Sequence, residues 1–183
     1  MPQVAANGIQ IEYESFGRET DPPLLLVMGL GMQLVAWPDD LCRALADRGF
    51  RVIRFDNRDV GLSSKIEGGP RPDVMAAIMG DASSRSYTLD DMADDAAGLL
   101  DALGVAAAHV VGASMGGMIA QVLSLRHPTR VLSLCSIMST TGDRSVGLPR
   151  PDALQAILRP PPRTRAEAQS WLFDPAAQAW VKP

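Results

Sequence analysis

Five stretches of the chain have the apolar pattern of β-strands. Residues 8–17 (GIQIEYESFG) alternate Ile9, Ile11 and Tyr13 with polar side chains, which is typical of a strand with one exposed face. The run PLLLVMG is apolar without interruption, as expected of a strand that helices cover on both faces. Further strands are predicted at FRVIRFD, AHVVGA and RVLSLCSIM. Such uninterrupted runs indicate a parallel sheet.

Helices are predicted between these strands, at residues 38–48, 88–103 and 116–127. The first has two aspartates in its opening turn and a stop at Gly49. The second starts at Thr88, where Asp91 three residues later gives a capping-box pattern, and Gly104 ends it. Alternating strands and helices predict a doubly wound, mostly parallel α/β sheet with right-handed crossovers.

The pattern changes after Gly142. The segments LPRPD and RPPPR interrupt two short helical patches, and three of the chain's aromatic side chains come late, at Trp171, Phe173 and Trp180. We therefore predict two parts: residues 1–142 form the N-terminal part of an α/β core, and residues 143–183 begin a cap or lid inserted into it.

The candidate chemistry lies where one predicted strand gives way to a helix. Residues 112–116, GASMG, satisfy G-x-S-x-G and follow the strand AHVVGA directly. A turn this sharp holds the serine at strained backbone angles and leaves almost no room for neighbouring side chains, so the glycines make room for it. The pattern predicts a nucleophile elbow with Ser114 as the nucleophile. The alternative is an ordinary turn with Ser114 as helix N-cap.

These features resemble the α/β-hydrolase fold family, and in particular its esterase-like branch, which includes aclacinomycin methylesterase. The resemblance runs from about residue 7 to residue 141 and also covers LLLVMGLGMQ, WPDDLCRALADRGFRVIRFDNRDVGLSS and RHPTRVLSL. In such proteins the loop corresponding to MGLG often begins with histidine, and Met28 replaces it here, a variation that this branch also shows. The resemblance implies an oxyanion hole formed by the backbone N–H groups of Leu30 and Met115.

The resemblance also implies a structural role for the segment DNRDVGLSS. It matches the family's turn after the following strand, and Asp59 takes a place that glycine often holds there. We interpret this segment as scaffolding that shapes the oxyanion loop.

A serine needs a base about 3 Å away to take its proton, and this chain has only two histidines. His109 lies five strand residues before Ser114, roughly 16 Å away. His127 lies thirteen helical residues after it, roughly 20 Å away. The resemblance implies that the acid and the histidine follow the cap, outside this sequence, and Asp143 is too remote a candidate acid to assign to the site.

We therefore expect the chain to be the N-terminal part of a longer hydrolase, or one that a second polypeptide completes, with the sheet incomplete at its C-terminal side. The apolar strand VLSLCSIM supports this expectation, because an uncovered apolar edge strand promotes aggregation.

The net charge and short sequence patterns argue against several other classes of function. The net charge of −4 argues against a nucleic-acid partner and fits a small uncharged substrate. No signal sequence or membrane span is recognisable, so we expect a cytoplasmic protein. The run MGLGMQL has the outline of a dinucleotide fingerprint with Asp56 as its acid, but the third glycine is missing, since Leu34 stands there. We expect no cofactor.

We also expect no metal. Cys42 and Cys135 are interpreted as buried reduced thiols with no further ligand nearby. The aspartates of residues 90–101 are interpreted as a solvated helix face. The arginines after residue 143 are interpreted in the same way, as solvated surface rather than a site for an acidic substrate. They are Arg144, Arg150, Arg159, Arg163 and Arg165.

The leading hypothesis is a serine hydrolase acting on a small carboxylic ester or similar acyl compound. A cofactor-free haloperoxidase-like perhydrolase would use the same serine. An inactive α/β module retained for binding or assembly is the alternative of a different class, favoured by the absence of a usable histidine. Five methionines are interpreted either as core or as the lining of an apolar substrate pocket. They are Met28, Met32, Met115, Met118 and Met138.

Overall fold

The computed structural model describes residues 2–70, 81–143, 145, 146, 150 and 164. The chain divides into two compact units, Met1–Asp143 and Arg144–Pro183, and nearly all described residues belong to the first. Most of the predicted cap lies outside the described residues, including its three late aromatic residues and all of its arginines except Arg150.

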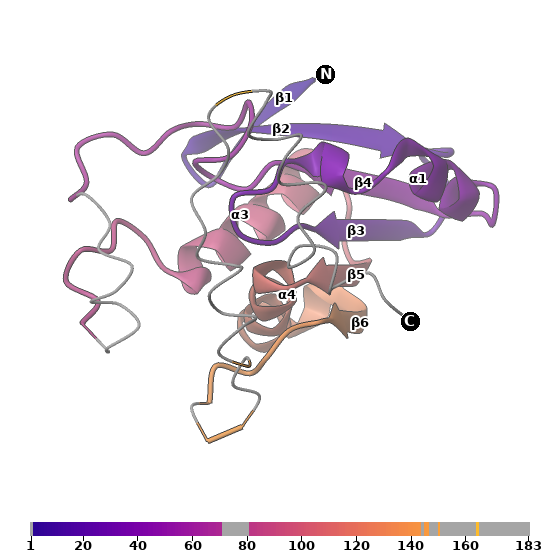
Figure 1. The fold of residues 1–183 in the computed structure, drawn as a ribbon. Coiled ribbons are helices and arrows are strands. Elements are labelled where there is room, and N and C mark those ends of the chain that lie inside the picture. Colours follow the sequence, from indigo (N-terminus) through magenta and orange to yellow (C-terminus); the bar gives the residue numbers. More distant parts are fainter. Residues whose placement is uncertain (1, 71–80, 144, 147–149, 151–163, 165–183) are drawn as a thin grey trace. The chain divides into compact units, whose positions relative to one another are not determined.

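The first unit is built on one six-stranded sheet (Figure 1). Its strands are β1 (Gln3–Ala6), β2 (Ile9–Phe16), β3 (Pro23–Val27), β4 (Arg51–Phe55), β5 (Ala108–Ala113) and β6 (Val131–Ile137). The order across the sheet is β1-β2-β4-β3-β5-β6. Strands β3, β4, β5 and β6 pair in parallel, whereas β1 and β2 add antiparallel pairs at one side. The predicted mostly parallel α/β sheet is confirmed.

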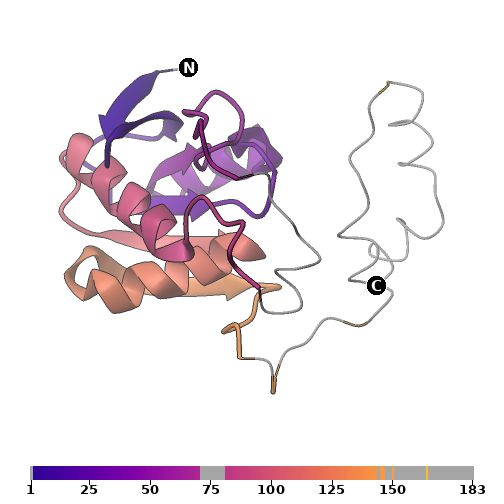
Figure 2. The same cartoon turned by 90° about the vertical axis from the view of Figure 1, so that its left-hand side faces the viewer.

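Helices cover both faces of this sheet. They are α1 (Asp39–Ala46), α3 (Leu89–Ala102) and α4 (Met115–Arg126), with 3-10 turns at Leu34–Ala36 and Pro128–Arg130. Helices α3 and α4 lie side by side and pack with Leu25, Ile53 and Val110 in the larger core (Figure 2). Helix α1 contributes Cys42 to a smaller core on the other face. All three predicted helices are present, and no helix among the described residues is long and apolar enough to cross a membrane.

Strand β1 was not predicted from the apolar pattern. It pairs with β2 across the turn at Asn7 and Gly8, whose φ angles are 47° and 78°. Two consecutive residues with positive φ are what a two-residue hairpin turn requires, and Asn-Gly is the sequence that adopts them most readily. The dipeptide was therefore the signal for this hairpin.

Strand β6 forms the edge of the described sheet beyond β5, and its residues after Val131 are exposed. Leu132 is 57% exposed and Leu134 39%. The prediction of two buried thiols is half wrong for the same reason: Cys42 is buried, but Cys135 lies on this uncovered strand and is exposed. Both are free thiols.

Candidate active site

Ser114 occupies the sharp corner between β5 and α4. Its backbone angles are φ 55° and ψ −124°, outside both regular helix and strand. The Ser114 N–H donates to the carbonyl of Ile137 at 2.9 Å, and the Ser114 carbonyl accepts from Gly117 N–H at 2.9 Å. The side chain makes no capping hydrogen bond, so the alternative of an ordinary N-cap is not supported. The corner has the backbone of a nucleophile elbow.

Gly112 and Gly116 cannot carry a side chain, because backbone atoms of neighbouring segments already occupy the space. A Cβ on Gly112 would lie 2.2 Å from the carbonyl oxygen of Gly116, and one on Gly116 would lie 2.1 Å from that of Val27. Neither oxygen can move without shifting a strand or a helix. A Cβ on Gly29 would approach the Ser114 Cβ to 3.1 Å, so the loop after β3 passes directly beside the serine.

The two predicted oxyanion residues directly follow Gly29 and Ser114, the two residues that meet at this corner. Leu30 follows Gly29 on the loop after β3, and its side chain is 64% exposed. Met115 is the first residue of α4, and its side chain packs against the larger core. The loop after β3 and the start of α4, which are far apart in sequence, thus meet at this corner. Their role as donors to an oxyanion stays a prediction.

The methionines divide between the two interpretations. Met28 is 7% exposed and belongs to the smaller core. Met32 and Met138 are exposed at 53% and 78%, and Met138 directly follows Ile137, whose carbonyl binds the Ser114 amide. Core packing accounts for Met28 and Met115, whereas Met32 and Met138 present apolar surface from segments that adjoin Ser114.

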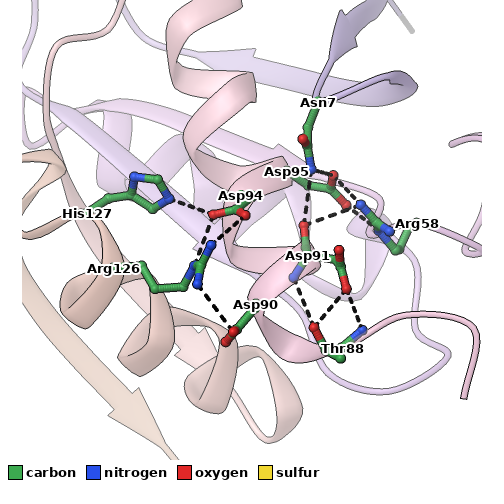
Figure 3. A network of polar contacts seen from close by, with 9 residues as sticks. All are labelled: Asn7, Arg58, Thr88, Asp90, Asp91, Asp94, Asp95, Arg126 and His127. Atoms are coloured by element: carbon green, nitrogen blue, oxygen red, sulfur yellow. Dashed lines mark hydrogen bonds and ion pairs between the residues drawn. The ribbon is translucent and has the colours of Figure 1, made fainter.

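Each histidine has a partner away from Ser114. His109 Nδ1 lies 2.8 Å from Ser133 Oγ, and its ring meets Phe50 edge to face. His127 Nε2 lies 2.7 Å from Asp94 Oδ1 (Figure 3). These contacts agree with the geometric expectation that neither histidine serves Ser114.

Asp95 contradicts the interpretation of the α3 aspartates as a solvated face, whereas Asp90 and Asp101 are exposed as expected. Asp95 is 2% exposed and binds Arg58 through both carboxylate oxygens, each at 2.6 Å. Hydrogen bonding to Arg126 lowers the pKa of Asp94. Among the described residues, no three His, Cys, Asp or Glu side chains gather closely enough to hold a metal ion.

Asp56 is buried and fully engaged by backbone, which leaves the dinucleotide alternative without support. Its Oδ1 accepts from Leu34 N–H at 2.7 Å and its Oδ2 from Leu62 N–H at 2.9 Å, and the residue is 3% exposed. An acid that binds a ribose must face solvent or ligand. Asp56 instead joins the loop after β3 to the turn after β4, which agrees with the interpretation of DNRDVGLSS as scaffolding for that loop, although the individual bonds were not predicted.

A comparison with protein families identifies the chain. The family model for the alpha/beta hydrolase fold matches residues 22–179. The chain belongs to the α/β-hydrolase family. It is 40% identical over 121 residues to the rhodomycin D methylesterase DauP of Streptomyces sp. (strain C5), covering 66% of this chain and 36% of that relative. It is 32% identical over 168 residues to the putative carbamate hydrolase RutD of Variovorax paradoxus, covering 91% of this chain and 57% of that relative.

Solved structures of this α/β-hydrolase family agree with the fold. The enol-lactonase from Burkholderia xenovorans LB400 superimposes with a TM-score of 0.65 at 28% identity, covering 93% of this chain and 58% of that one. The chain therefore spans between about a third and three fifths of the length of these three relatives. A methylesterase, a putative carbamate hydrolase and an enol-lactonase agree with the esterase-like resemblance of the sequence.

Proposed function

We propose that this chain is the nucleophile-bearing part of a serine hydrolase that cleaves a small carboxylic ester or a similar acyl compound. The observation that supports this most is the Ser114 backbone at φ 55° and ψ −124°, held between a strand and a helix by glycines that admit no side chain. Such strain persists only where surrounding structure enforces it, and it concentrates at functional sites.

In the proposed reaction, Ser114 Oγ attacks the ester carbonyl and transfers its proton to a histidine. The negative charge on the carbonyl oxygen is stabilised by the N–H groups of Leu30 and Met115, together with the positive end of the α4 dipole. The C–O bond to the alcohol then breaks, the alcohol leaves with the proton, and an acyl-serine remains. Water, activated by the same histidine, releases the acid and restores Ser114.

The histidine and its orienting acid are proposed to come from outside these 183 residues. Both histidines of the sequence are bound elsewhere, His109 to Ser133 and His127 to Asp94. The base then belongs either to further residues of the same polypeptide or to a partner chain. The proposed mechanism uses only the serine, the backbone N–H groups, the histidine with its acid, and water.

Labelling with a fluorophosphonate probe tests the proposal, because the probe reacts quickly only with an activated serine. The complete gene product should be labelled at Ser114, and the S114A variant should not be labelled. S124A removes a hydroxyl from α4, the helix that follows Ser114. It serves as the matched control and should label normally. The isolated 183-residue chain should label far more slowly. Absent labelling of the complete product would contradict the enzyme proposal and favour the inactive binding module.

A further inference from the structure

Two adjacent residues after β4 hold both ends of the loop that contains Leu30. Asn57 Nδ2 donates to the carbonyl of Met28 at 2.9 Å, where the loop leaves β3. Asp56 Oδ1 accepts from Leu34 N–H at 2.7 Å, where the loop enters its 3-10 turn. The loop of residues 28–34 is thus fixed at its start and at its end by one short segment.

This segment is itself held firmly. Asp56 and Asn57 are 3% and 2% exposed, so water does not compete for their hydrogen bonds. Ser63 Oγ donates to the Asp56 carbonyl at 2.6 Å and accepts from Glu12 N–H at 2.9 Å, which connects the segment to β2. A Cβ on Gly61 would lie 1.8 Å from Asp56 Oδ2, so the following turn closes directly on the carboxylate.

The loop between the two anchors has few constraints of its own. Leu30 stands between Gly29 and Gly31, and Gly31 has φ 68° with no atom within 4 Å of the position a Cβ would take. Its internal backbone hydrogen bond, from Met32 N–H to the Gly29 carbonyl, is long at 3.4 Å. Donors to an oxyanion act only when their orientation is fixed before the reaction.

From this geometry, and resting on the proposed function, we infer that Asp56 and Asn57 are positioning residues that orient the Leu30 N–H toward the oxyanion. A carboxylate is needed at position 56 because two N–H groups, of Leu34 and Leu62, require two acceptor oxygens. An amide there supplies one oxygen and turns an NH2 group toward the other N–H. The loop end at Leu34 or the turn at Leu62 is then released.

The test uses D56N and N57A in the complete gene product, with p-nitrophenyl acetate as the substrate. Each variant acts on a different end of the same loop. We expect kcat to fall at least about tenfold in each, because small misplacements of catalytic groups have effects of this size, while KM changes by less than about threefold. A residue that only stabilises the fold would not separate kcat from KM in this way.

D59N is the matched control. It makes the same chemical change in the same segment, but Asp59 is exposed and its Oδ1 binds Ile66 N–H rather than the loop of residues 28–34. Its φ of 65° is one that asparagine also tolerates. Its kcat should remain within about twofold of the parent, in line with a surface change that leaves the site untouched.

The S114A variant separates the two proposals. Turnover that survives S114A overturns the proposed function, whatever the other variants do. Turnover that requires Ser114 but is unchanged in kcat by D56N and N57A overturns the positioning role alone. If D56N fails to fold, N57A decides. Unfolding of both, judged by circular dichroism, also overturns the inference, because these residues would then support the whole fold rather than one loop.

Discussion

Ser114 adopts a backbone conformation that its own side chain disfavours. At φ 55° and ψ −124° a Cβ is crowded by the main chain, which costs about 1–3 kcal/mol. Glycine releases this strain, although it also adds entropy to the unfolded chain. We expect S114G to exceed S114A in free energy of unfolding by about 1 kcal/mol, measured by urea denaturation. Neither variant should label with fluorophosphonate. An S114G protein less stable than S114A would mean that the corner is unstrained, because only the entropy cost of glycine would then remain.

Gly116 and Gly117 offer a second comparison at neighbouring positions of α4. Alanine at either gains about 1 kcal/mol of helix propensity. A Cβ on Gly116 meets the Val27 carbonyl at 2.1 Å, whereas one on Gly117 meets the Ser136 and Ser139 side chains at 2.6 Å. The two hydroxyls can rotate away, and the Ser139 Cβ can shift with the segment after the edge strand β6, whereas the Val27 carbonyl belongs to an interior strand. The steric cost therefore dominates at Gly116, where we expect a net loss of about 2 kcal/mol.

G117A is therefore the control for G116A. Thermal and urea unfolding should rank parent, G117A and G116A in that order, and G116A should also lose fluorophosphonate labelling in the complete gene product. A G116A protein as stable as G117A would show that β3 does not press against this turn of the helix.

Among the elements, α3 shows how a capping box that is visible in the sequence stabilises the start of a helix. The Thr88 hydroxyl accepts from Asp91 N–H at 3.3 Å, and Asp91 Oδ2 accepts from Thr88 N–H at 2.7 Å, which completes the capping box. Thr88 lowers the pKa of Asp91 through its side-chain hydrogen bond first and its backbone hydrogen bond second. The cap thus stabilises both the helix end and the charged form of Asp91.

T88A is expected to lower the free energy of unfolding by about 1 kcal/mol at pH 7. Because the folded-state pKa of Asp91 lies below its ordinary value of 3.8, the stability from its charge is present above pH 3.8 and is lost as the pH falls through the folded value. The gap between T88A and the parent should therefore narrow below pH 3.8 in urea titrations. S86A, which removes an exposed hydroxyl two residues earlier, should show neither effect.

Local signals also decided which elements could be predicted from the sequence. Five strands and three helices followed from apolar runs, caps and glycine stops, since each of these acts within one element. Strand β1 has only four residues, too few for a period to show, and the Asn7-Gly8 turn that identifies it is a signal of chain geometry rather than apolar pattern. The exposure of Cys135 depends on what lies beyond β6, which no residue of the strand encodes.

The residues of the candidate site also differ in whether a local sequence signal identifies them. Ser114 and its glycines lie within five consecutive residues, so the motif identified them directly. The anchors of the Leu30 loop could not be found in this way, because Asp56 is 22 residues from Leu34 and Asn57 is 29 from Met28. Only the order of β3 and β4 in the sheet brings them together. Asp95 was misinterpreted for the same reason, since its partner Arg58 is 37 residues away.

At the scale of the whole first unit, Arg58 and Asp95 join three distant segments. Arg58 comes from the turn after β4, Asp95 from α3, and Asn7 from the β1–β2 turn donates to Asp95 Oδ1 at 2.8 Å (Figure 3). The Arg58 guanidinium also lies over the Tyr87 ring, 5.2 Å from its centre. The ion pair is buried, with side-chain exposures of 9% and 2%.

Removing one partner of such a pair leaves a buried charge without compensation, so R58M should lower the free energy of unfolding by about 3–5 kcal/mol. The double variant R58M/D95L should be clearly more stable than the sum of the single variants predicts, because it removes both charges. Urea denaturation of the four proteins of the cycle measures this coupling. R43M, in the Arg43–Asp39 pair whose side chains are 65% and 54% exposed, makes the same change and should leave stability within experimental error. Additive losses across the cycle would mean that Arg58 and Asp95 support the unit separately rather than as a pair.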